Sequence, residues 1–558
     1  MSRNLTSLSG RKGLSNNLFE RLGELSEIEG APTEESLKAL ADKFLMGPAN
    51  LYGAASFYDL TRPGNRGIKV YACNGSACQL AGTQPGLKAK LSAYFKEEEV
   101  GEMCCLGRCH ENAAFQYQGL NYSGPDADAL QAILEGRHPA GSGKYEVHAH
   151  GRALLTRDFP SLESCCQTLA EMLARGPQAA LAEVEASGLQ GRGGAGFPIS
   201  VKMKHCAQAP GSPKFVVCNA DEGDPGAYSD RYLLEQQPYA VLLGMLIAGY
   251  AIGAHEGVLY IRAEYPESME RMSQAIMELE HRGLAGEDVL DSGFAFHFKL
   301  LKARGAYICG EETALLASIE GQRPEVRVRP PYPALEGLFG KPTLVNNVET
   351  LANLYYILRD GGAAFRAIGT RNNTGTKLLS LDSAFMRPGV YEVEMGTALD
   401  VVVDELGGGF SHPVKALHIG GPLGGVVPLG MIPELAVDFE SFSRHGFLLG
   451  HASVIGIPKD YPMIVYLEHL FEFAAHESCG KCFPCRLGTV RGQELLHKAR
   501  AGGYVIDGDL FESLLDTLER GSLCGLGGGI PLPVRNALQY FRDELEPYFS
   551  KLQSAGHE

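Results

Sequence analysis

The segment FVVCNADEGDPG, residues 215–226, joins an apolar run to a cluster of carboxylates and glycines. Its first six residues are typical of a buried β-strand, and GVLYIRAE at residues 257–264 is typical of a second. The apolar stretch 239–254 between them contains two tyrosines and fits a buried helix. Strand, helix and strand in this order predict an α/β fold, in which ligands gather at the carboxyl ends of the strands.

Composition limits the classes of protein to which the chain can belong. The 558 residues predict several domains, and 45% apolar with 21% charged residues is typical of a globular protein. A formal net charge of −16 argues against binding to nucleic acid. No stretch reaches the ~18 to 20 apolar residues of a membrane helix, and the amino terminus lacks the apolar core of a signal peptide. We therefore expect a cytoplasmic protein without direct membrane insertion.

The predicted secondary structure of the amino-terminal part changes near residue 68, from helices to a mixture of strands and helices. LFERLGELSEI and EESLKALADKFL have apolar residues at helical spacing and predict helices between residues 14 and 60. Between 68 and 150, IKVYAC predicts a strand, GLKAKLSAYFKEE a helix, and FQYQGLNYSG a short strand and turn. The result is a βαβ-like unit with cysteines at strand ends. A boundary is expected near 140–160, where the sequence is aperiodic and contains glycine and serine.

The sequence after residue 160 predicts three further regions of secondary structure. SLESCCQTLAEMLA and AALAEVEASGL predict two helices before the glycine-rich GRGGAGFP at residues 191–198. Short alternating runs between about 376 and 440, such as GVYEVEMGTALDVVVDELGGG, predict a small β-rich module. From 461 to the end the pattern is helical again.

Fourteen cysteines in a reducing compartment, most of them in two clusters, indicate metal rather than disulfides. In the first cluster the pairs CNGSAC and CLGRC stand about 26 residues apart and can hold a [2Fe–2S] cluster. A structural zinc site is the alternative, although zinc pairs usually have two-residue gaps. Spacing alone does not decide whether Cys104 or the adjacent Cys105 is the ligand. The expected ligands are Cys73, Cys78, Cys105 and Cys109.

The second cluster lies in HESCGKCFPCRLGT, residues 476–489, and in GSLCGLG further on. Three cysteines at consecutive two-residue gaps with one remote cysteine are typical of a [4Fe–4S] cluster, and zinc rarely uses that spacing. The three are expected to open a helix, whose amide dipoles favour the negative charge of a cluster. The expected ligands are Cys479, Cys482, Cys485 and Cys524.

Four segments between the cysteine clusters carry groups suited to a nucleotide or flavin. GRGGAGF formally matches G-x-G-x-x-G, but the preceding segment is helical, whereas a Rossmann fingerprint needs a strand there. A flexible linker is the alternative. Two acidic patches follow predicted strands, where ligands gather in α/β folds. Carboxylates there can accept hydrogen bonds from ribose hydroxyls and would repel a 2′-phosphate, which favours NAD over NADP. The alternative is that each patch is a solvated turn. The polar groups are Asn219, Asp221, Glu222 and Asp224, then Tyr307, Gly310, Glu311 and Glu312, then Asn346, Asn347 and Thr350.

Together these segments resemble a known family. GRGGAGFP, CNADEGDPGAYSDR, YICGEETALL, GKPTLVNNVETLAN and CGKCFPCR are near-verbatim motifs of the NADH-oxidising flavoprotein subunit of respiratory complex I, and the likeness spans about residues 160–545. LYGAASFY, CNGSAC and CLGRC resemble its thioredoxin-like [2Fe–2S] companion over residues 14–130. The fusion resembles diaphorase subunits of soluble NAD-linked formate dehydrogenases and NAD-reducing nickel–iron hydrogenases.

The resemblance implies an α/β multidomain fold. It comprises a thioredoxin-like [2Fe–2S] domain with amino-terminal helices (1–145), a Rossmann-like FMN- and NAD(H)-binding domain (150–375), a small β-grasp-like domain (376–460) and a carboxy-terminal helical [4Fe–4S] bundle (461–558). It also implies four cofactors or substrates: FMN, NAD(H), one [2Fe–2S] cluster and one [4Fe–4S] cluster.

The resemblance further implies roles for named residues. Glu222 and Glu312 would lie beside the flavin and nicotinamide, and Phe197 would stack on the adenine. Four nucleotide-contacting positions depart from the family pattern: His205 replaces an aromatic residue, Asp224 a glutamate, Arg329 a lysine and Tyr332 a phenylalanine. The residues expected to hold FMN are Gly191, Gly193, Lys202, Asn219, Asp221, Tyr307, Gly310, Glu311, Asn346 and Asn347.

The chemistry implied is electron transfer between NAD(H) and a partner. FMN would exchange hydride with the nicotinamide and pass single electrons through the [4Fe–4S] cluster, with the [2Fe–2S] cluster as a temporary store. No site for molybdenum, tungsten or nickel is evident in the sequence, so a separate catalytic subunit is expected. A formate dehydrogenase alpha subunit with further Fe–S clusters is the first expectation; a nickel–iron hydrogenase or a complex I-type dehydrogenase is the alternative. Two alternatives belong to a different functional class: a non-catalytic Fe–S scaffold and a zinc-stabilised interaction protein. Metal analysis would distinguish a zinc protein from an iron–sulfur protein.

Overall fold

The predicted strand–helix–strand unit forms the centre of a four-stranded parallel sheet in the computed structural model, which describes residues 13–137 and 144–551. The strand order is β8-β7-β6-β9, with β6 at Phe215–Ala220, β7 at Glu256–Ile261, β8 at His297–Lys302 and β9 at Thr343–Asn347. Alternate side chains of β6 enter different cores: Val216 faces one layer and Val217 the other. The expectation of a buried parallel α/β sheet is confirmed.

One face of this sheet is covered by α11 (Pro238–Ile252), a helix that is apolar all round and almost wholly buried. It packs against α15 (Val348–Asp360), which follows β9 directly. The surrounding helices are α7 (Leu162–Arg175), α8 (Pro177–Ser187), α9 (Ile199–Gln208), α10 (Ser229–Gln236), α12 (Pro266–His281), α14 (Pro333–Glu336) and α16 (Gly362–Arg366).

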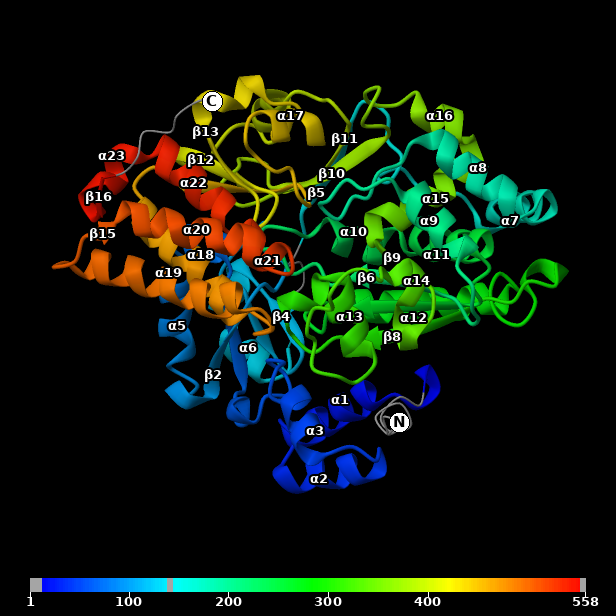
Figure 1. The fold of residues 1–558 in the computed structure, drawn as a ribbon, viewed down its shortest axis with the longest axis horizontal. Coiled ribbons are helices and arrows are strands. Elements are labelled where there is room, and N and C mark those ends of the chain that lie inside the picture. The colour runs from blue at the N-terminus through cyan, green and yellow to red at the C-terminus, as the bar shows by residue number, and fades with distance from the viewer. Residues whose placement is uncertain (1–12, 138–143, 552–558) are drawn as a thin grey trace.

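The other face is covered by α13 (Glu312–Ile319) and by the amino-terminal helix α1 (Leu18–Glu29), whose Phe19 lies in the same core. Helices α2 (Glu34–Lys43) and α3 (Pro48–Ala55) pack on α1 in a separate core. Phe19 of α1 stacks on Tyr260 of β7, with 5.9 Å between the ring centroids. The Asn17 side chain caps α1 and donates to the Ile319 carbonyl at 2.7 Å. Helix α1 therefore docks on the parallel sheet, below it in Figure 1, and α2 and α3 pack against α1.

The predicted βαβ-like unit is present as a four-stranded sheet of order β2-β1-β3-β4, in which β1 and β2 are parallel. Cys73 ends β1, and Cys104 and Cys105 follow β2, so the cysteines do lie at strand ends. The predicted helix in GLKAKLSAYFKEE ends early, at Leu91. The elements are β1 (Val70–Cys73), α4 (Ser76–Leu80), α5 (Gln84–Leu91), β2 (Val100–Met103), β3 (Phe115–Tyr117), β4 (Leu120–Tyr122) and α6 (Leu130–Leu134).

The β-rich module is a six-stranded sheet of order β13-β12-β14-β10-β11-β5. Its edge strand β5 (Glu146–His150) comes from the segment expected to be aperiodic, and it pairs in parallel with β11. That expectation was wrong for residues 146–150, while residues 138–143 lie outside the described residues. The other elements are β10 (Thr376–Leu381), β11 (Gly389–Glu394), β12 (Val414–Ile419), β13 (Gly425–Pro428), α17 (Phe439–Arg444) and β14 (Ser453–Pro458).

The carboxy-terminal part is helical, as predicted, and lies beside both the small sheet and the β-rich module (Figure 1). Its elements are α18 (Met463–His476), α19 (Phe483–Ala501), β15 (Ile506–Asp507), α20 (Gly508–Gly521), α21 (Gly525–Gly529), α22 (Pro531–Tyr540), α23 (Arg542–Leu545) and β16 (Phe549–Ser550). Among the helices in the described ranges, none combines the length and apolarity needed to cross a membrane.

The contact between α11 and α15 leads to a stability prediction. A Cβ atom added at Gly244 would lie 1.9 Å from the Leu351 carbonyl oxygen, so the helices would have to separate. We expect Gly244→Ala to lower the free energy of unfolding by at least about 1 to 3 kcal/mol, as overpacking does. The midpoint of thermal unfolding, followed by circular dichroism, measures this.

Gly53→Ala is the matched control. Gly53 lies inside α3, and a Cβ there meets nothing within 4 Å. Removing a helical glycine stabilises by roughly 0.5 to 1 kcal/mol, so the midpoint should stay or rise. Equal midpoints for the two variants would mean that the helices are not in close contact.

Candidate functional site

The GRGGAGFP segment is a loop between α8 and α9, folded back by a bridge between Gln190 and Pro198. It is held by Arg192, whose side chain is wholly buried and points away from solvent. The Arg192 guanidinium donates to the carbonyl oxygens of Gln190, Thr374 and Thr376, and its backbone N–H donates to Thr350 Oγ1 at 2.8 Å. The loop is therefore a fixed element rather than a flexible linker.

Two adjacent cavities open between this loop and the carboxyl ends of β6 and β9. The larger has a volume of about 360 Å³ and the smaller about 220 Å³. Five residues line both: Gly193, Ala195, Asn219, Gly310 and Asn347. The two spaces thus form one continuous cleft at the strand ends, where an α/β fold is expected to bind ligands.

The structure brings most of the predicted residues to this cleft. The larger cavity is lined by Asp221, Glu222, Asp224, Tyr307 and Glu311 in addition to the shared residues. The smaller cavity is lined by Gly191, Phe197, Lys202, Glu312, Asn346 and Thr350. The linings of both cavities, as described, leave out His205, Arg329 and Tyr332.

The walls contain polar atoms without partners. Asp221 Oδ2 and Asn346 Nδ2 are buried and make no hydrogen bond within the described part of the chain, and Glu311 Oε1 has only an ion pair with Arg329 at 3.6 Å. Buried polar groups are nearly always paired, so these atoms fit a polar ligand. At Gly193 a Cβ atom would lie 3.0 Å from Asn347 Cβ and would fill space shared by both cavities. The donor set and the bare backbone fit a flat ring system with a polar chain, such as FMN.

Charged side chains lie in and next to the wall of the smaller cavity. Lys202 Nζ lies 3.1 Å from Glu312 Oε2, and Arg329 Nη1 lies 3.2 Å from Glu312 Oε1. Phe197 is 52% exposed and Tyr332 56% exposed, so both rings are free to stack on a ligand. His205 is exposed on α9, which packs against α14 just after Tyr332. Three of the four departures from the family pattern, His205, Arg329 and Tyr332, therefore lie at the open side of the cleft, whereas Asp224 lines the larger cavity.

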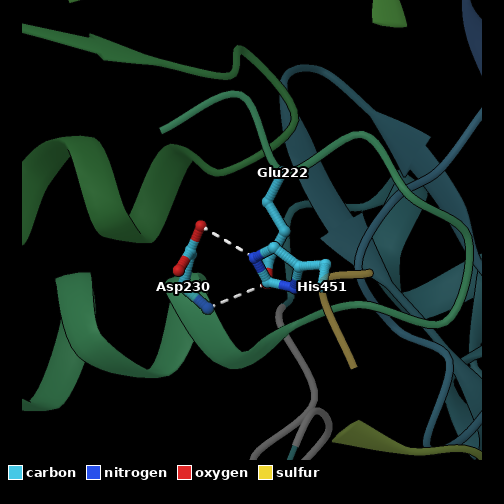
Figure 2. A group of neighbouring side chains, drawn as sticks. All are labelled: Glu222, Asp230 and His451. Carbon is cyan, nitrogen blue, oxygen red and sulfur yellow. Dashed lines mark hydrogen bonds and ion pairs between the residues drawn. The ribbon is translucent and has the colours of Figure 1, made fainter. Parts of the chain in front are cut away.

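Three buried side chains meet in the wall of the larger cavity: Glu222, Asp230 and His451 (Figure 2). His451 Nε2 lies 3.2 Å from Asp230 Oδ2 and 3.8 Å from Glu222 Oε1. Burial alone would lower the pKa of His451, but the two carboxylates raise it to about 9. Burial raises the pKa of Glu222 to about 7, with repulsion from Asp230 adding to the effect.

Sequence analysis missed Asp230 and His451. His451 stands in the loop before β14, more than 200 residues after Asp230, and no spacing motif links the two. The only available signal for Asp230 was its place at the end of the acidic segment that carries Glu222. Their juxtaposition is a tertiary property, because the β-rich module has to fold against α10 to create it.

Arg262, just after β7, was also missed and connects the cavity to the first cysteine cluster. It is wholly buried, pairs with Glu264 at 2.8 Å and lies 3.6 Å from Asp221 Oδ1. Its Nη1 donates to the Glu222 carbonyl at 2.6 Å, and its Nη2 donates to the Cys104 carbonyl at 3.4 Å. One guanidinium therefore binds the backbone of both sites.

The first cysteine cluster is a buried group of four thiols, Cys73, Cys78, Cys105 and Cys109. Cys105 Sγ lies 3.4 Å from Cys109 Sγ, and Cys73 interacts with the other three. Backbone N–H groups of Gly107 and Gly226 donate to Cys105 and Cys109 at 3.4 and 3.2 Å. Four thiols with amide donors fit a [2Fe–2S] cluster. The Cys104 side chain is half-buried.

The second cysteine cluster surrounds the start of α19. Cys482 is its N-cap residue and Cys485 lies in its first turn, so the predicted opening of a helix is confirmed. Cys485 interacts with Cys479 and Cys482, and Cys524 interacts with Cys479 and Cys485. Gly525 and Leu526, which follow Cys524, line the larger cavity. Asp224 also lines this cavity, and it lies two residues before Gly226, whose N–H donates to Cys109. The cavity thus lies between the two cysteine clusters.

Three families match separate parts of the chain. Residues 184–356 match the Nuo51 FMN-binding domain, residues 466–548 the NADH-ubiquinone oxidoreductase-F iron-sulfur binding region, and residues 7–138 the thioredoxin-like [2Fe-2S] ferredoxin. NADH-quinone oxidoreductase F 2, a Rhizobium meliloti subunit, is 41% identical over 67% of this chain and 89% of its own length. NAD-reducing hydrogenase HoxS subunit alpha of Cupriavidus necator is 32% identical over 97% of this chain and 93% of its own length.

A solved structure is similar over the same extent. A chain in the crystal structure of NAD+-reducing [NiFe]-hydrogenase in the H2-reduced state has a TM-score of 0.84 at 28% identity, covering 97% of this chain and 93% of that chain. The likeness therefore includes the amino-terminal [2Fe–2S] part and the carboxy-terminal helices.

Arg192 gives a prediction about the loop. Arg192→Met keeps the length of the side chain but leaves the three carbonyl acceptors without their donor, at a cost of roughly 1 to 3 kcal/mol for each group left unsatisfied. We expect a fall of at least about 2 kcal/mol in the free energy of unfolding, seen as a lower thermal midpoint.

Arg175→Met serves as the control, since Arg175 is 54% exposed and its ion pair within the described ranges is with Glu183. A surface ion pair contributes about 0 to 1 kcal/mol, so its midpoint should hardly move. If both variants melted alike, the buried guanidinium would not be what fixes the loop.

Proposed function

Because the chain belongs to the family of NADH-oxidising flavoprotein subunits found in NADH-quinone oxidoreductase and in NAD-reducing hydrogenase, we propose that it moves electrons between NAD(H) and a catalytic partner subunit. The family's FMN, [2Fe–2S] and [4Fe–4S] regions are all present in the one chain, and NAD(H) is its substrate. The observation that supports the proposal most strongly is the cavity with unpaired polar atoms between two groups of buried thiols.

FMN, when bound, converts the two-electron hydride step of the nicotinamide into the one-electron steps of the clusters. The chain's own contribution is to position it. The loop at Gly191 and Gly193 offers bare backbone, while Asn346 Nδ2 and the Lys202 ammonium offer donors. The proposed FMN-binding residues are Gly191, Gly193, Lys202, Asn219, Asp221, Tyr307, Gly310, Glu311, Asn346, Asn347 and Thr350.

The nucleotide is proposed to enter through the open side of the cleft. Phe197 would stack on the adenine, and His205, Asp224, Arg329 and Tyr332 would contact the rest of the nucleotide. Glu312, tied to Lys202 and Arg329, is partly exposed and suited to a hydrogen bond with the substrate. Glu222 is wholly buried and accepts hydrogen bonds from the Asp230 and Arg231 N–H groups, so its influence on the nicotinamide would act through the wall of the cavity.

Electrons would leave and enter through the cysteine-bound clusters. The proposed [2Fe–2S] ligands are Cys73, Cys78, Cys105 and Cys109, and the proposed [4Fe–4S] ligands are Cys479, Cys482, Cys485 and Cys524. Cys482 and Cys524 are half-buried, whereas the four [2Fe–2S] thiols are buried. We therefore propose that the [4Fe–4S] site is the one nearer to a docking partner.

Two identities are proposed for that partner. A formate dehydrogenase alpha subunit is the one expected from the fused architecture, and a nickel–iron hydrogenase is supported by a relative and a structure that match nearly the whole chain. The complex purified from its source would reduce NAD+ with formate in the first case and with hydrogen in the second.

The activity itself is tested on the purified chain loaded with iron, sulfide and FMN. We expect NADH to bleach the flavin and iron–sulfur absorption and to drive reduction of an artificial dye. Absorption spectra before and after NADH measure this. A fully loaded protein whose spectrum does not respond to NADH would contradict the proposal.

Cys105→Ser should abolish the [2Fe–2S] signal, since its thiol lies 3.4 Å from that of Cys109. Cys104→Ser is the matched control: it changes the adjacent thiol, which we do not assign as a ligand, and should leave the signal intact. Iron content and the electron paramagnetic resonance spectrum after reduction measure both. The reverse pattern would make Cys104 the ligand.

A further inference from the structure

The larger cavity has an unusual balance of charge. Its lining as described contains five carboxylates, Asp221, Glu222, Asp224, Asp230 and Glu311, and no lysine or arginine. Burial raises the pKa of Asp221, Glu222 and Asp224. FMN is itself an anion, so each carboxyl of this wall that is ionised would oppose its binding and still more its reduction. His451 is the one side chain among the described lining residues that can carry positive charge.

The position of His451 is fixed by the carboxylates around it. Asp230, which faces its Nε2 at 3.2 Å, also accepts from Asn347 Nδ2 at 2.8 and 3.1 Å. Glu222 accepts from the Asp230 N–H at 2.8 Å and from the Tyr265 hydroxyl at 3.0 Å. Neither carboxylate can turn away without losing these bonds, so the imidazole ring is held from one side.

The other ring nitrogen of His451 is not used by the protein. Nδ1 is buried and has no hydrogen-bond partner in the parts of the chain that the structure describes, although the residue is only 7% exposed. The two carboxylates raise the pKa of His451 to about 9 against the effect of burial, so the ring is an imidazolium with an N–H on both nitrogens. A buried charged donor without an acceptor is costly, which indicates that a ligand supplies the acceptor.

This reasoning rests on the proposed function. We propose that His451 donates a hydrogen bond from Nδ1 to the ring system of bound FMN and thereby favours reduced over oxidised flavin. His451 would then be a residue that tunes the cofactor, beyond the motifs that identify the FMN site.

The direction of the effect follows from the balance of charge. Hydride carries one proton and two electrons, so a flavin that accepts it from NADH gains one negative charge while NADH becomes NAD+. A fixed imidazolium in a buried site favours the more negative form, because interactions of charges are stronger where water is excluded. Charge near the flavin ring is a recognised determinant of its electronic properties.

The experiment compares His451→Gln with wild type in the FMN-loaded, cluster-containing chain. Glutamine keeps an N–H donor but no charge. We expect the affinity for reduced FMN, relative to oxidised FMN, to fall about tenfold, which corresponds to a two-electron midpoint potential about 30 mV lower. Spectroelectrochemical titration of the flavin measures it. His445→Gln is the matched control, since His445 is bonded to the Ser441 carbonyl and lies outside the cavity lining.

Three outcomes would overturn the proposal. An unchanged midpoint potential in His451→Gln would mean that the imidazolium does not act on the ring. Weaker binding of FMN but not of riboflavin, with an unchanged potential, would place the contact at the phosphate. A divalent metal ion that is present in wild type and lost in the variant would mean that Glu222, Asp230 and His451 bind metal instead.

A second variant covers the case in which His451→Gln does not fold. His451→Asn, with a shorter neutral amide, should show the same fall in potential. If neither variant yields folded protein, His451 has a structural role and the proposal fails. Failure of the proposed function is a separate result: wild type itself would then bind no FMN or show no reduction by NADH.

Discussion

The structure depends on one buried guanidinium. Arg262 lies at the end of β7, wholly removed from solvent, and it can remain charged there only because Glu264 and Asp221 lie beside it. Its remaining donors reach the carbonyls of Glu222 and Cys104. The backbone of the flavin cavity and the backbone of the [2Fe–2S] loop are therefore fixed by the same group, so neither can shift independently of the other.

The same principle governs the part of the cavity wall that contains Glu222, Asp230 and His451. Asp230 accepts from His451 Nε2 and from Asn347 at the end of β9, and Glu222 lies 3.8 Å from the same ring nitrogen. The parallel sheet brings these strand ends together, and the β-rich module closes the wall with the loop before β14. A site for an anionic cofactor is thus built largely from carboxyl groups, with the buried cations Arg262 and His451 held between them.

The sequence predicted the features that are local. The βαβ pattern, the helix at the third closely spaced cysteine and the cysteines at strand ends were all predictable, because they depend on hydrophobic period and spacing. The features missed depend on contacts between distant segments. β5 could not be predicted from a short polar run, EVHAH, which becomes a strand only by pairing with β11. Arg262 and His451 carried no motif, and their roles follow from burial and partners that only the folded chain supplies.

The docking of α1 has a consequence for biosynthesis. Asn17 bonds to Ile319, a partner 302 residues further along the chain. Translation adds about 5 to 20 residues per second, so the apolar face of α1 would wait roughly 15 to 60 s for the sheet that covers it. During that interval Phe19 can pack only on Tyr58, since its other aromatic neighbour, Tyr260 of β7, belongs to the sheet that is still to form. Chaperones that shield nascent chains would have their first natural target at this helix.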